Sequence, residues 1–230
     1  MTFLRILFLF LLTVATSHTA CAQADPEEAE PAKMRTRYVL FTTPVKKDTQ
    51  VHGIALGLMA VPWGHAKRLH INGLNLELEP WAALMAGVGV VMPVVALFKK
   101  MPDGAVAETA PPDSAATTQY QGTIIRGVSV SGGGLASDTR LYGLSLNGLL
   151  GMAESYGVMV SGLMNGSDDF SGLQLAAVGN MSAQGRGLQI GLFNTCLNGR
   201  VLQLGLLNRI GNRITPVVNF RFRKSALPKG

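Results

Sequence analysis

The sequence predicts an all-β protein made of tandem repeats of 14–15 residues, arranged as an antiparallel meander that closes as a barrel of roughly ten strands. One phrase is written five times, as GLSLNGLLG (143–151), GVMVSGLMN (157–165), GLQLAAVGN (172–180), GLQIGLFN (187–194) and VLQLGLLN (201–208). Within each copy, apolar residues alternate with small or polar ones, which is the period of a strand. The content of 27 Gly, 7% aromatic and 15% charged residues is typical of a repetitive β protein.

The copies begin 14, 15, 15 and 14 residues apart. A fixed short period indicates one small unit that is copied so that each copy buries its neighbour. We therefore interpret the repeat as a scaffold first.

The N-terminal stretch is typical of a targeting segment. Arg5 precedes an apolar run, Ile6–Leu12, and a small-residue stretch ends before Gln23. We expect a signal peptide at 1–22, followed by an acidic, Pro-containing disordered tether at 23–34. Removing the segment would leave 19 basic and 14 acidic residues, because Arg5 is its only charged residue.

Cys21 offers a second interpretation of this segment. Thr19-Ala20-Cys21 is similar to the end of a bacterial lipobox, although His18 stands where such a motif usually has Leu. The chain would then be a lipoprotein anchored through Cys21. Both interpretations predict export from the cytoplasm.

A single β-repeat domain is expected over 35–223. Tyr38–Val45 is rich in β-branched and aromatic residues and predicts a strand, which a turn follows. The repeat phrase then recurs as GIALGL within Val51–Pro62 and as GLNLEL within Leu69–Pro80.

An apolar excursion interrupts the repeat. The segment 81–98 contains 18 uncharged residues, the lower limit for a membrane-spanning helix. Gly87, Gly89 and Pro93 favour instead a helix or hairpin that packs on the sheet or dips into a bilayer surface. The following residues, up to 122, have the Pro, Ala, Ser and Thr content of a flexible loop.

The repeat resumes at Thr123 and ends in a last alternating strand, Pro216–Arg223. The template copies and both flanks give ten strand candidates. A basic tail, 224–230, follows.

Two faces are expected for each strand. In GLQIGLFN, alternation places Leu188, Ile190, Leu192 and Asn194 on one face, and Gly187, Gln189, Gly191 and Phe193 on the other. The face that carries Leu188, Ile190 and Leu192 would meet lipid in a membrane barrel, or form the core of a soluble repeat. The Asn that closes most copies is interpreted as a turn residue.

A β-solenoid is the alternative architecture, in which each copy is one coil and like residues stack. Short links and the even strand count favour the meander. The regular period suits both.

The phrases GLQIGLFN, LQLGLLN and TPVVNFRF, with GIALGL and HINGLNLELEP upstream, resemble a bacterial surface-repeat family of exported proteins with tandem G-L-Q-I-G-L-x-N units. The resemblance covers roughly residues 50–80 and 123–222. It implies a cell-surface or outer-membrane protein to which no catalytic residues are assigned.

No catalytic, cofactor or metal site is predicted. His18, His52, His65 and His70 lack Cys or carboxylate neighbours at ligand spacing. Cys196 lies in a link between copies, without the His of a nucleophile pair, and is interpreted as a half-buried small residue. An envelope hydrolase would need Glu154, Asp168 and Asp169 to converge on a pocket.

A structural or binding role at the outer membrane or cell surface of a Gram-negative bacterium is therefore expected. Outer-membrane lipid or surface polysaccharide are the candidate partners, and nucleic acid is not expected. The sequence suggests contact with anionic groups through a basic end, formed by Arg209, Arg213, Arg221, Arg223, Lys224 and Lys229.

Overall fold

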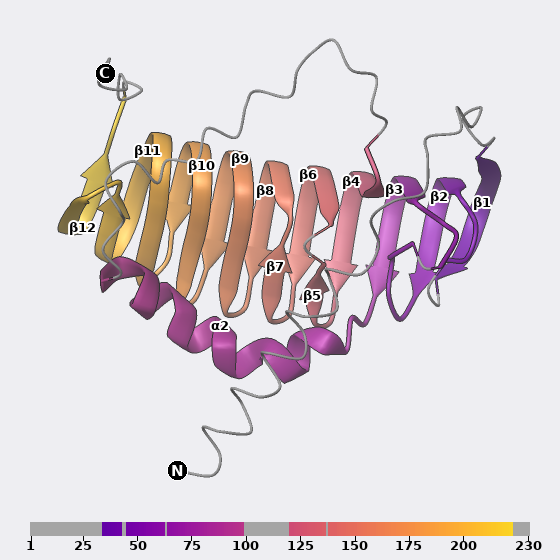
Figure 1. The fold of residues 1–230 in the computed structure, drawn as a ribbon, viewed down its shortest axis with the longest axis horizontal. Helices are drawn as coiled ribbons and strands as arrows, with labels where there is room; N and C mark the ends of the chain where they lie inside the picture. Colours follow the sequence, from indigo (N-terminus) through magenta and orange to yellow (C-terminus); the bar gives the residue numbers. More distant parts are fainter. Residues whose placement is uncertain (1–33, 43–44, 63, 99–119, 137, 223–230) are drawn as a thin grey trace, which may run out of the picture. The chain divides into compact units, whose positions relative to one another are not determined.

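The computed structural model describes residues 34–222, apart from 43–44, 63, 99–119 and 137 (Figure 1). The predicted signal peptide, nearly all of the tether, the loop after residue 98 and the basic tail lie outside the described residues. The described part is an all-β fold with one helix. Its elements are β1 (Arg35–Thr42), β2 (Thr49–Gly57), β3 (Arg68–Glu77), α2 (Trp81–Phe98), β4 (Gly122–Ser131), β5 (Gly134–Leu135), β6 (Thr139–Asn147), β7 (Leu150–Met152), β8 (Glu154–Ser161), β9 (Met164–Ala176), β10 (Gly179–Ile190), β11 (Phe193–Ile210) and β12 (Arg213–Phe220).

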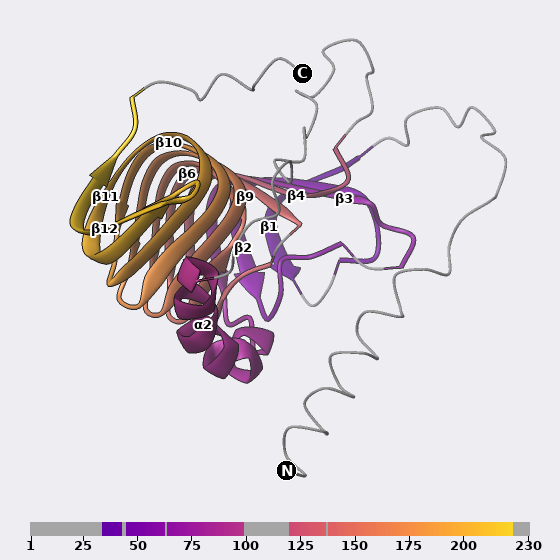
Figure 2. The same ribbon diagram turned by 60° about the vertical axis from the view of Figure 1, so that its left-hand side comes forward.

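The strands form one sheet in the order β1-β2-β3-β4-β6-β8-β9-β10-β11-β12, with β5 and β7 beside this path. Each pair from β1 to β11 is parallel, and only the last pair, β11 and β12, is antiparallel. The antiparallel meander closed as a barrel is therefore wrong, and the alternative β-solenoid is correct. Figure 2 shows the coils stacked one behind another.

The period of the repeat is the length of one coil. Gln189 pairs with Gln203, and Asn180 pairs with Asn194, so like residues meet in register on neighbouring coils. The link 195–200, whose length suggested a hairpin, lies within β11 on the second side of a coil. This second side is formed by β5, β7 and the first residues of β9, β10 and β11. This second side returns the chain to the start of the next parallel strand.

A ladder of glycines crosses the sheet in register. Gly172 and Gly187 pair in register and both have φ values that favour glycine, 134° and 138°. A Cβ built on Gly187 would collide with the carbonyl oxygen of Gly172. Gly therefore recurs in the template because the backbones of neighbouring coils approach closely at this point.

Helix α2 packs against the second side of the coils, which is one of the two placements expected for the excursion at 81–98. Ala82 is buried with Leu150 and Met164 in one apolar cluster, and Leu97 is also buried. Figures 1 and 2 show α2 running along one side of the stack. No helix in the described part of the chain is long and apolar enough to cross a membrane.

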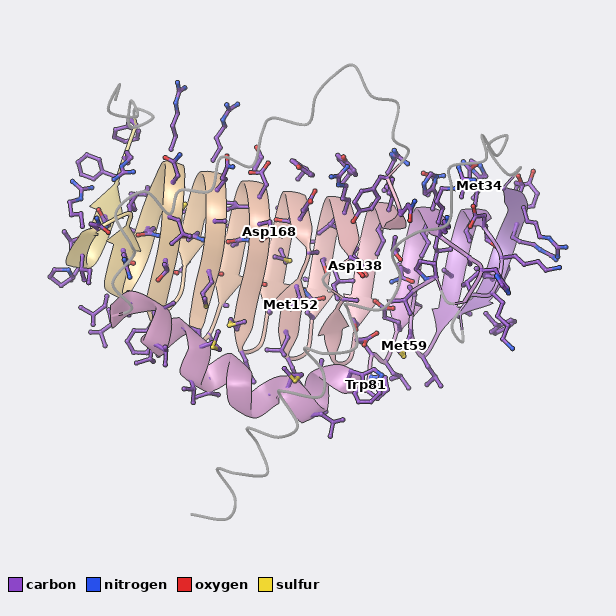
Figure 3. The ribbon with its side chains drawn as sticks, in the orientation of Figure 1. Met34, Met59, Trp81, Asp138, Met152 and Asp168 are labelled. Carbon is purple, nitrogen blue, oxygen red and sulfur yellow. The ribbon has the colours of Figure 1, made fainter. Side chains whose placement is uncertain are left out.

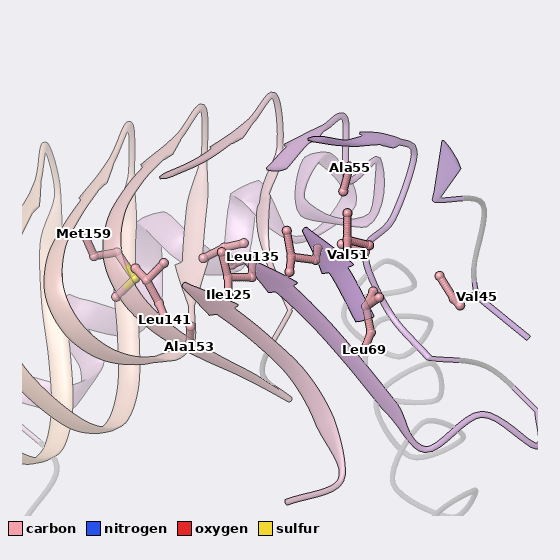
Figure 4. Close-up of a cluster of buried hydrophobic side chains, with 11 residues drawn as sticks. Val45, Val51, Ala55, Leu69, Ile125, Leu135, Leu141, Ala153 and Met159 are labelled. Atoms are coloured by element: carbon pink, nitrogen blue, oxygen red, sulfur yellow. The ribbon is translucent and has the colours of Figure 1, made fainter. Parts of the chain in front are cut away.

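The interior changes along the stack. In the N-terminal coils it is aliphatic, with Val51, Leu69, Ile125, Leu141 and Met159 in one cluster (Figure 4). In the C-terminal coils much of this volume is filled by amide side chains, among which the largest buried ones are Gln174, Gln189 and Gln203.

Strand β12 closes the C-terminal end. The chain reverses at Gly211, and Phe220 then pairs with Leu202. The last strand begins three residues earlier than the predicted Pro216.

Candidate functional site

A ladder of glutamines runs through the interior. Nε2 of Gln189 donates to Oε1 of Gln174 at 2.8 Å, and Nε2 of Gln203 donates to Oε1 of Gln189 at 2.8 Å. All three side chains are fully buried. Gln189 also donates to Oγ of Ser182 at 3.0 Å. Burying these amides is tolerated because each one bonds to its counterpart on a neighbouring coil, although Oε1 of Gln203, at the end of the ladder, has no hydrogen-bond partner among the described residues.

A second ladder is formed by asparagines. Asn165, Asn180, Asn194 and Asn208 donate one to the next at 2.9, 2.7 and 2.8 Å. Each of the first three also donates to a strand-end carbonyl, such as that of Ile190. These side chains thus bond to the backbone, as those of turn Asn residues do, but none of the four residues has the positive φ that a turn Asn often adopts.

The polarity of the long strands is inverted relative to an ordinary core. Gln189 is buried, whereas Leu188 and Ile190 on either side of it are partly exposed and point outward. The predicted alternation is therefore correct for these three residues. It is wrong beyond Ile190, because the chain turns a corner at Gly191 and Leu192, and Asn194 points inward while Leu192 points outward.

Two rows of apolar side chains cross the outside of the sheet, and we call them together the aliphatic face. The register places one residue of each row on every strand of the main path. The first row contains Val39, Ile54, Leu74, Val128, Leu144, Val158, Leu173, Leu188, Leu202 and Phe220. The second contains Phe41, Leu56, Leu76, Val130, Leu146, Val160, Leu175, Ile190, Leu204 and Val218.

A third row borders this face on the N-terminal side of the glycine ladder, and we call it the arginine–tyrosine row. It contains His52, Asn72, Arg126, Tyr142, Tyr156, Ser171, Arg186 and Arg200. The rings of Tyr142 and Tyr156 stack with centroids 5.0 Å apart, and the guanidinium of Arg126 lies 5.5 Å from the centre of the Tyr142 ring. A tyrosine side chain has an apolar ring and a polar hydroxyl at its tip, which suits a boundary between apolar and aqueous surroundings.

A hollow of about 320 Å³ lies in the same row between β8 and β11. Arg186 and Arg200 line it from successive coils, together with Tyr156 and Asp169. Among the described residues, neither of these two guanidiniums forms an ion pair, and Asp169 instead accepts a hydrogen bond from the Tyr156 hydroxyl at 3.3 Å. Two unpaired cations on adjacent coils make this hollow suitable for an anion.

On the other side of the aliphatic face, the apolar surface continues around the corner. Leu192 is 51% exposed and Leu206 is 59% exposed there. The corner residues Leu149 and Leu163 of earlier coils pack against the cluster of α2. The outer side of α2 is itself apolar, with Leu84 70% exposed, and Trp81 lies at its N-terminal end (Figure 3).

Arg209 anchors α2 at its C-terminal end. Its Nη1 donates to the carbonyl oxygens of Ala96 at 2.7 Å and Leu97 at 3.2 Å, and its Nε donates to that of Gly211 at 2.7 Å. A cation at this end also complements the helix dipole. Because Arg209 is buried, the prediction that it belongs to an exposed basic end is wrong.

The other residues of the predicted basic end fall into two groups. Arg213 and Arg221 donate to groups of their own hairpin, namely Asn219 and Ile210. Arg223, Lys224 and Lys229 lie outside the described residues.

The three carboxylates of the hydrolase alternative lie on β8 and β9. Glu154 forms an ion pair with Arg140 at 2.6 Å, Asp169 bonds to Tyr156, and Asp168 is exposed, away from α2 (Figure 3). Only Asp169 lines the hollow. The structure therefore does not gather the three around that hollow.

Cys196 is fully buried rather than half-buried. Burial raises the pKa of its thiol to about 11, so the thiolate that a nucleophile needs is disfavoured. His52 and His65 are exposed, and burial lowers the pKa of His70. Within the described ranges, no three His, Cys, Asp or Glu side chains gather as metal ligands would.

Two buried carboxyl groups lie near the start of α2. Glu77 accepts a hydrogen bond from the Ala60 amide at 2.7 Å, and burial raises its pKa to about 7. Burial also raises the pKa of Glu79. The Glu77 side chain is enclosed and fixes the connection between β2 and β3 at Ala60.

Sequence reasoning missed the arginine–tyrosine row. A signal for it was present, because each member but Arg200 directly precedes a glycine of the ladder, as in RGVSV, YGLSL and RGLQI. A parallel register was needed to turn this recurrence into one continuous row.

Comparison with known proteins found no matching family model, no similar curated protein and no similar solved structure.

Proposed function

We propose that the chain is an exported envelope protein, of the outer membrane or cell surface, whose solenoid has a structural or binding role and no catalytic one. The pattern of residues 1–22 supports export. The resemblance to exported proteins with G-L-Q-I-G-L-x-N units supports the same compartment.

The observation that carries a binding role is the outward surface of the long strands. Every coil presents an Arg, Tyr or other polar residue, then two aliphatic residues, at the same place. Neighbouring strands lie about 4.8 Å apart, so these residues form straight rows. A surface that repeats in this way suits an extended or planar partner, whereas a small substrate requires a concave site with a few converging polar groups.

Fractionation of a Gram-negative host that expresses the full chain tests this proposal. We expect the protein in the envelope fraction, with a mature N-terminus at Gln23. A mature N-terminus at an acylated Cys21 would instead favour the lipoprotein alternative, and mass spectrometry distinguishes the two. Recovery of the full-length chain in the cytosol, with residues 1–22 retained, would contradict the proposal.

The hydrolase alternative has its own test. The purified protein should show no hydrolytic activity, either with its native residues or with alanine at Glu154, Asp168 and Asp169. If these substitutions abolished a hydrolytic activity of the purified protein, the binding role would be overturned.

A further inference from the structure

The aliphatic face is an uncovered apolar feature that spans the sheet, and its partner can be inferred from the rows that border it. Apolar side chains that point outward across a whole sheet are unfavourable in water. Polar groups on the same strands, such as those of Gln174 and Gln189, point inward and bond to one another. This arrangement, with amides inside and aliphatic groups outside, fits an apolar environment around the protein.

Charge identifies the kind of apolar environment. None of the described residues in the two aliphatic rows or in the arginine–tyrosine row is acidic, and three of them, Arg126, Arg186 and Arg200, are exposed cations. The nearest carboxylates, Glu154 and Asp169, lie two residues before this row on their strands. Three cations, interspersed with tyrosines along one border of an apolar surface, complement the phosphate groups of a lipid headgroup layer.

The dimensions agree with this partner. Ile190 lies four residues after Arg186, a distance of about 13 Å along the strand at 3.3 Å per residue. An interfacial protein surface buries its apolar side about 5–10 Å into the boundary between headgroups and acyl chains. With the arginine–tyrosine row among the headgroups, the two aliphatic rows therefore reach the acyl chains.

The shape of the apolar surface favours lipid over a second copy of the chain. The surface does not end at the second row, because Leu192 and Leu206 are exposed at the corner of the coil and Leu84 is exposed on α2. A second copy stacked face to face on the two rows would cover the flat part and leave the corner exposed. Flexible acyl chains can cover both the two rows and the corner.

We propose that the aliphatic face docks on a bilayer that contains anionic phospholipid, with Arg126, Arg186 and Arg200 at the phosphate groups and the corner at Leu192 and Leu206 deepest. This inference rests on the proposed envelope function, of which it names the partner. It is tested on the purified full chain, so that failure of vesicle binding and failure of export are separate results.

Co-sedimentation with vesicles of phosphatidylcholine and phosphatidylglycerol in equal parts, and with vesicles of phosphatidylcholine alone, measures the partition coefficient. We expect tighter binding to the anionic vesicles, and weaker binding at high salt. The double variant Arg186→Gln/Arg200→Gln should lower the partition coefficient roughly 30-fold, since each cation near an anionic surface contributes about a factor of five. The matched control Lys46→Gln/Lys47→Gln removes the same charge from an exposed loop before β2, and should change it much less.

A second pair of variants tests the apolar contact. Leu188→Thr/Leu202→Thr should weaken binding to both kinds of vesicle by roughly ten-fold or more. The control Ala183→Thr/Leu197→Thr changes residues of the same two strands that lie on the second side of the coil, and it should not weaken binding to the vesicles. Circular dichroism establishes that each variant retains its β structure.

Three results would overturn the inference. The first is an absence of binding to either vesicle, and the second is unchanged binding after Arg186→Gln/Arg200→Gln. The third is a dimer in light scattering that Leu188→Thr/Leu202→Thr dissociates, together with no vesicle binding, which would assign the face to a second copy.

Discussion

Nε2 of Gln203 donates to Oε1 of Gln189 at 2.8 Å, and neither side chain is exposed to solvent. The two residues occupy the same place in successive coils, where a soluble repeat would be expected to bury leucine. A ladder of this kind stabilises only when it is complete, because an amide left without its partner keeps the cost of leaving water.

Two substitutions on β10 test whether amides form the inside of the coil and leucines its outside. Gln189→Leu removes the donor to Gln174 and an acceptor of Gln203, so we expect the free energy of unfolding to fall by roughly 2–4 kcal/mol. Leu188→Gln, on the outside of the same strand, should change it by less than about 1 kcal/mol. Urea denaturation measures both, and a larger cost for Leu188→Gln would show that the leucine is the core residue.

The glycine ladder predicts an extreme cost for a single methyl group. Gly187→Ala places a Cβ against the Gly172 carbonyl at a φ of 138°, so we expect a loss of roughly 3 kcal/mol or more. Gly87→Ala is the matched control, because Gly87 lies in α2 with no atom near a Cβ. It should stabilise the protein by up to about 1 kcal/mol, the difference in helix propensity. Equal effects in thermal unfolding would contradict the close approach of the coils.

Arg209 predicts how α2 is held. Arg209→Met removes the donors to Ala96, Leu97 and Gly211, and should lower the free energy of unfolding by roughly 2–4 kcal/mol. Amide hydrogen exchange should then accelerate selectively in the last turns of α2. Arg200→Met, an exposed cation on the same strand, serves as the control and should leave exchange in α2 unchanged.

The buried carboxyl of Glu77 predicts a pH dependence. Its pKa is raised from 4.5 to about 7 in the folded protein, mainly by burial, so the folded state holds this proton when the unfolded state has lost it. Stability should therefore fall as the pH rises from about 4.5 to 7, by roughly 3 kcal/mol at about 1.4 kcal/mol per pKa unit. Glu77→Gln should flatten the curve over this range. A wild-type stability that rises across the same range would contradict the assignment.

The sequence was sufficient to predict the strands, the period and an apolar excursion at 81–98, for which packing on the sheet was one of two expected placements. The Gly and Gln residues at positions 187 and 189 recur at the equivalent positions of a neighbouring coil, which identifies the repeat and its strand alternation. Strand direction could not be predicted in the same way. An alternating strand looks identical in parallel and antiparallel pairs, and the second side of each coil was short enough to be taken for a hairpin loop.

The choice of inner face was also open. Leu188 and Ile190 are natural core residues, and Gln189 becomes one only if Gln174 and Gln203 stand in register with it. This condition depends on the parallel stacking itself. The arginine–tyrosine row follows the same logic, because Arg186 and Arg200 become neighbours only in that register.

The most direct test of the account measures immersion depth along one strand. Nitroxide labels are placed one at a time at Arg186, Leu188, Ile190 and Leu192, in a chain whose native cysteines are replaced by Ser. Collision with oxygen and with a water-soluble nickel reagent is then measured with and without anionic vesicles. We predict that vesicles raise oxygen access and lower nickel access progressively from position 186 to position 192. Oxygen and nickel access that vesicles leave unchanged, or values that place position 186 deepest in the bilayer, would contradict the docking of the aliphatic face on lipid.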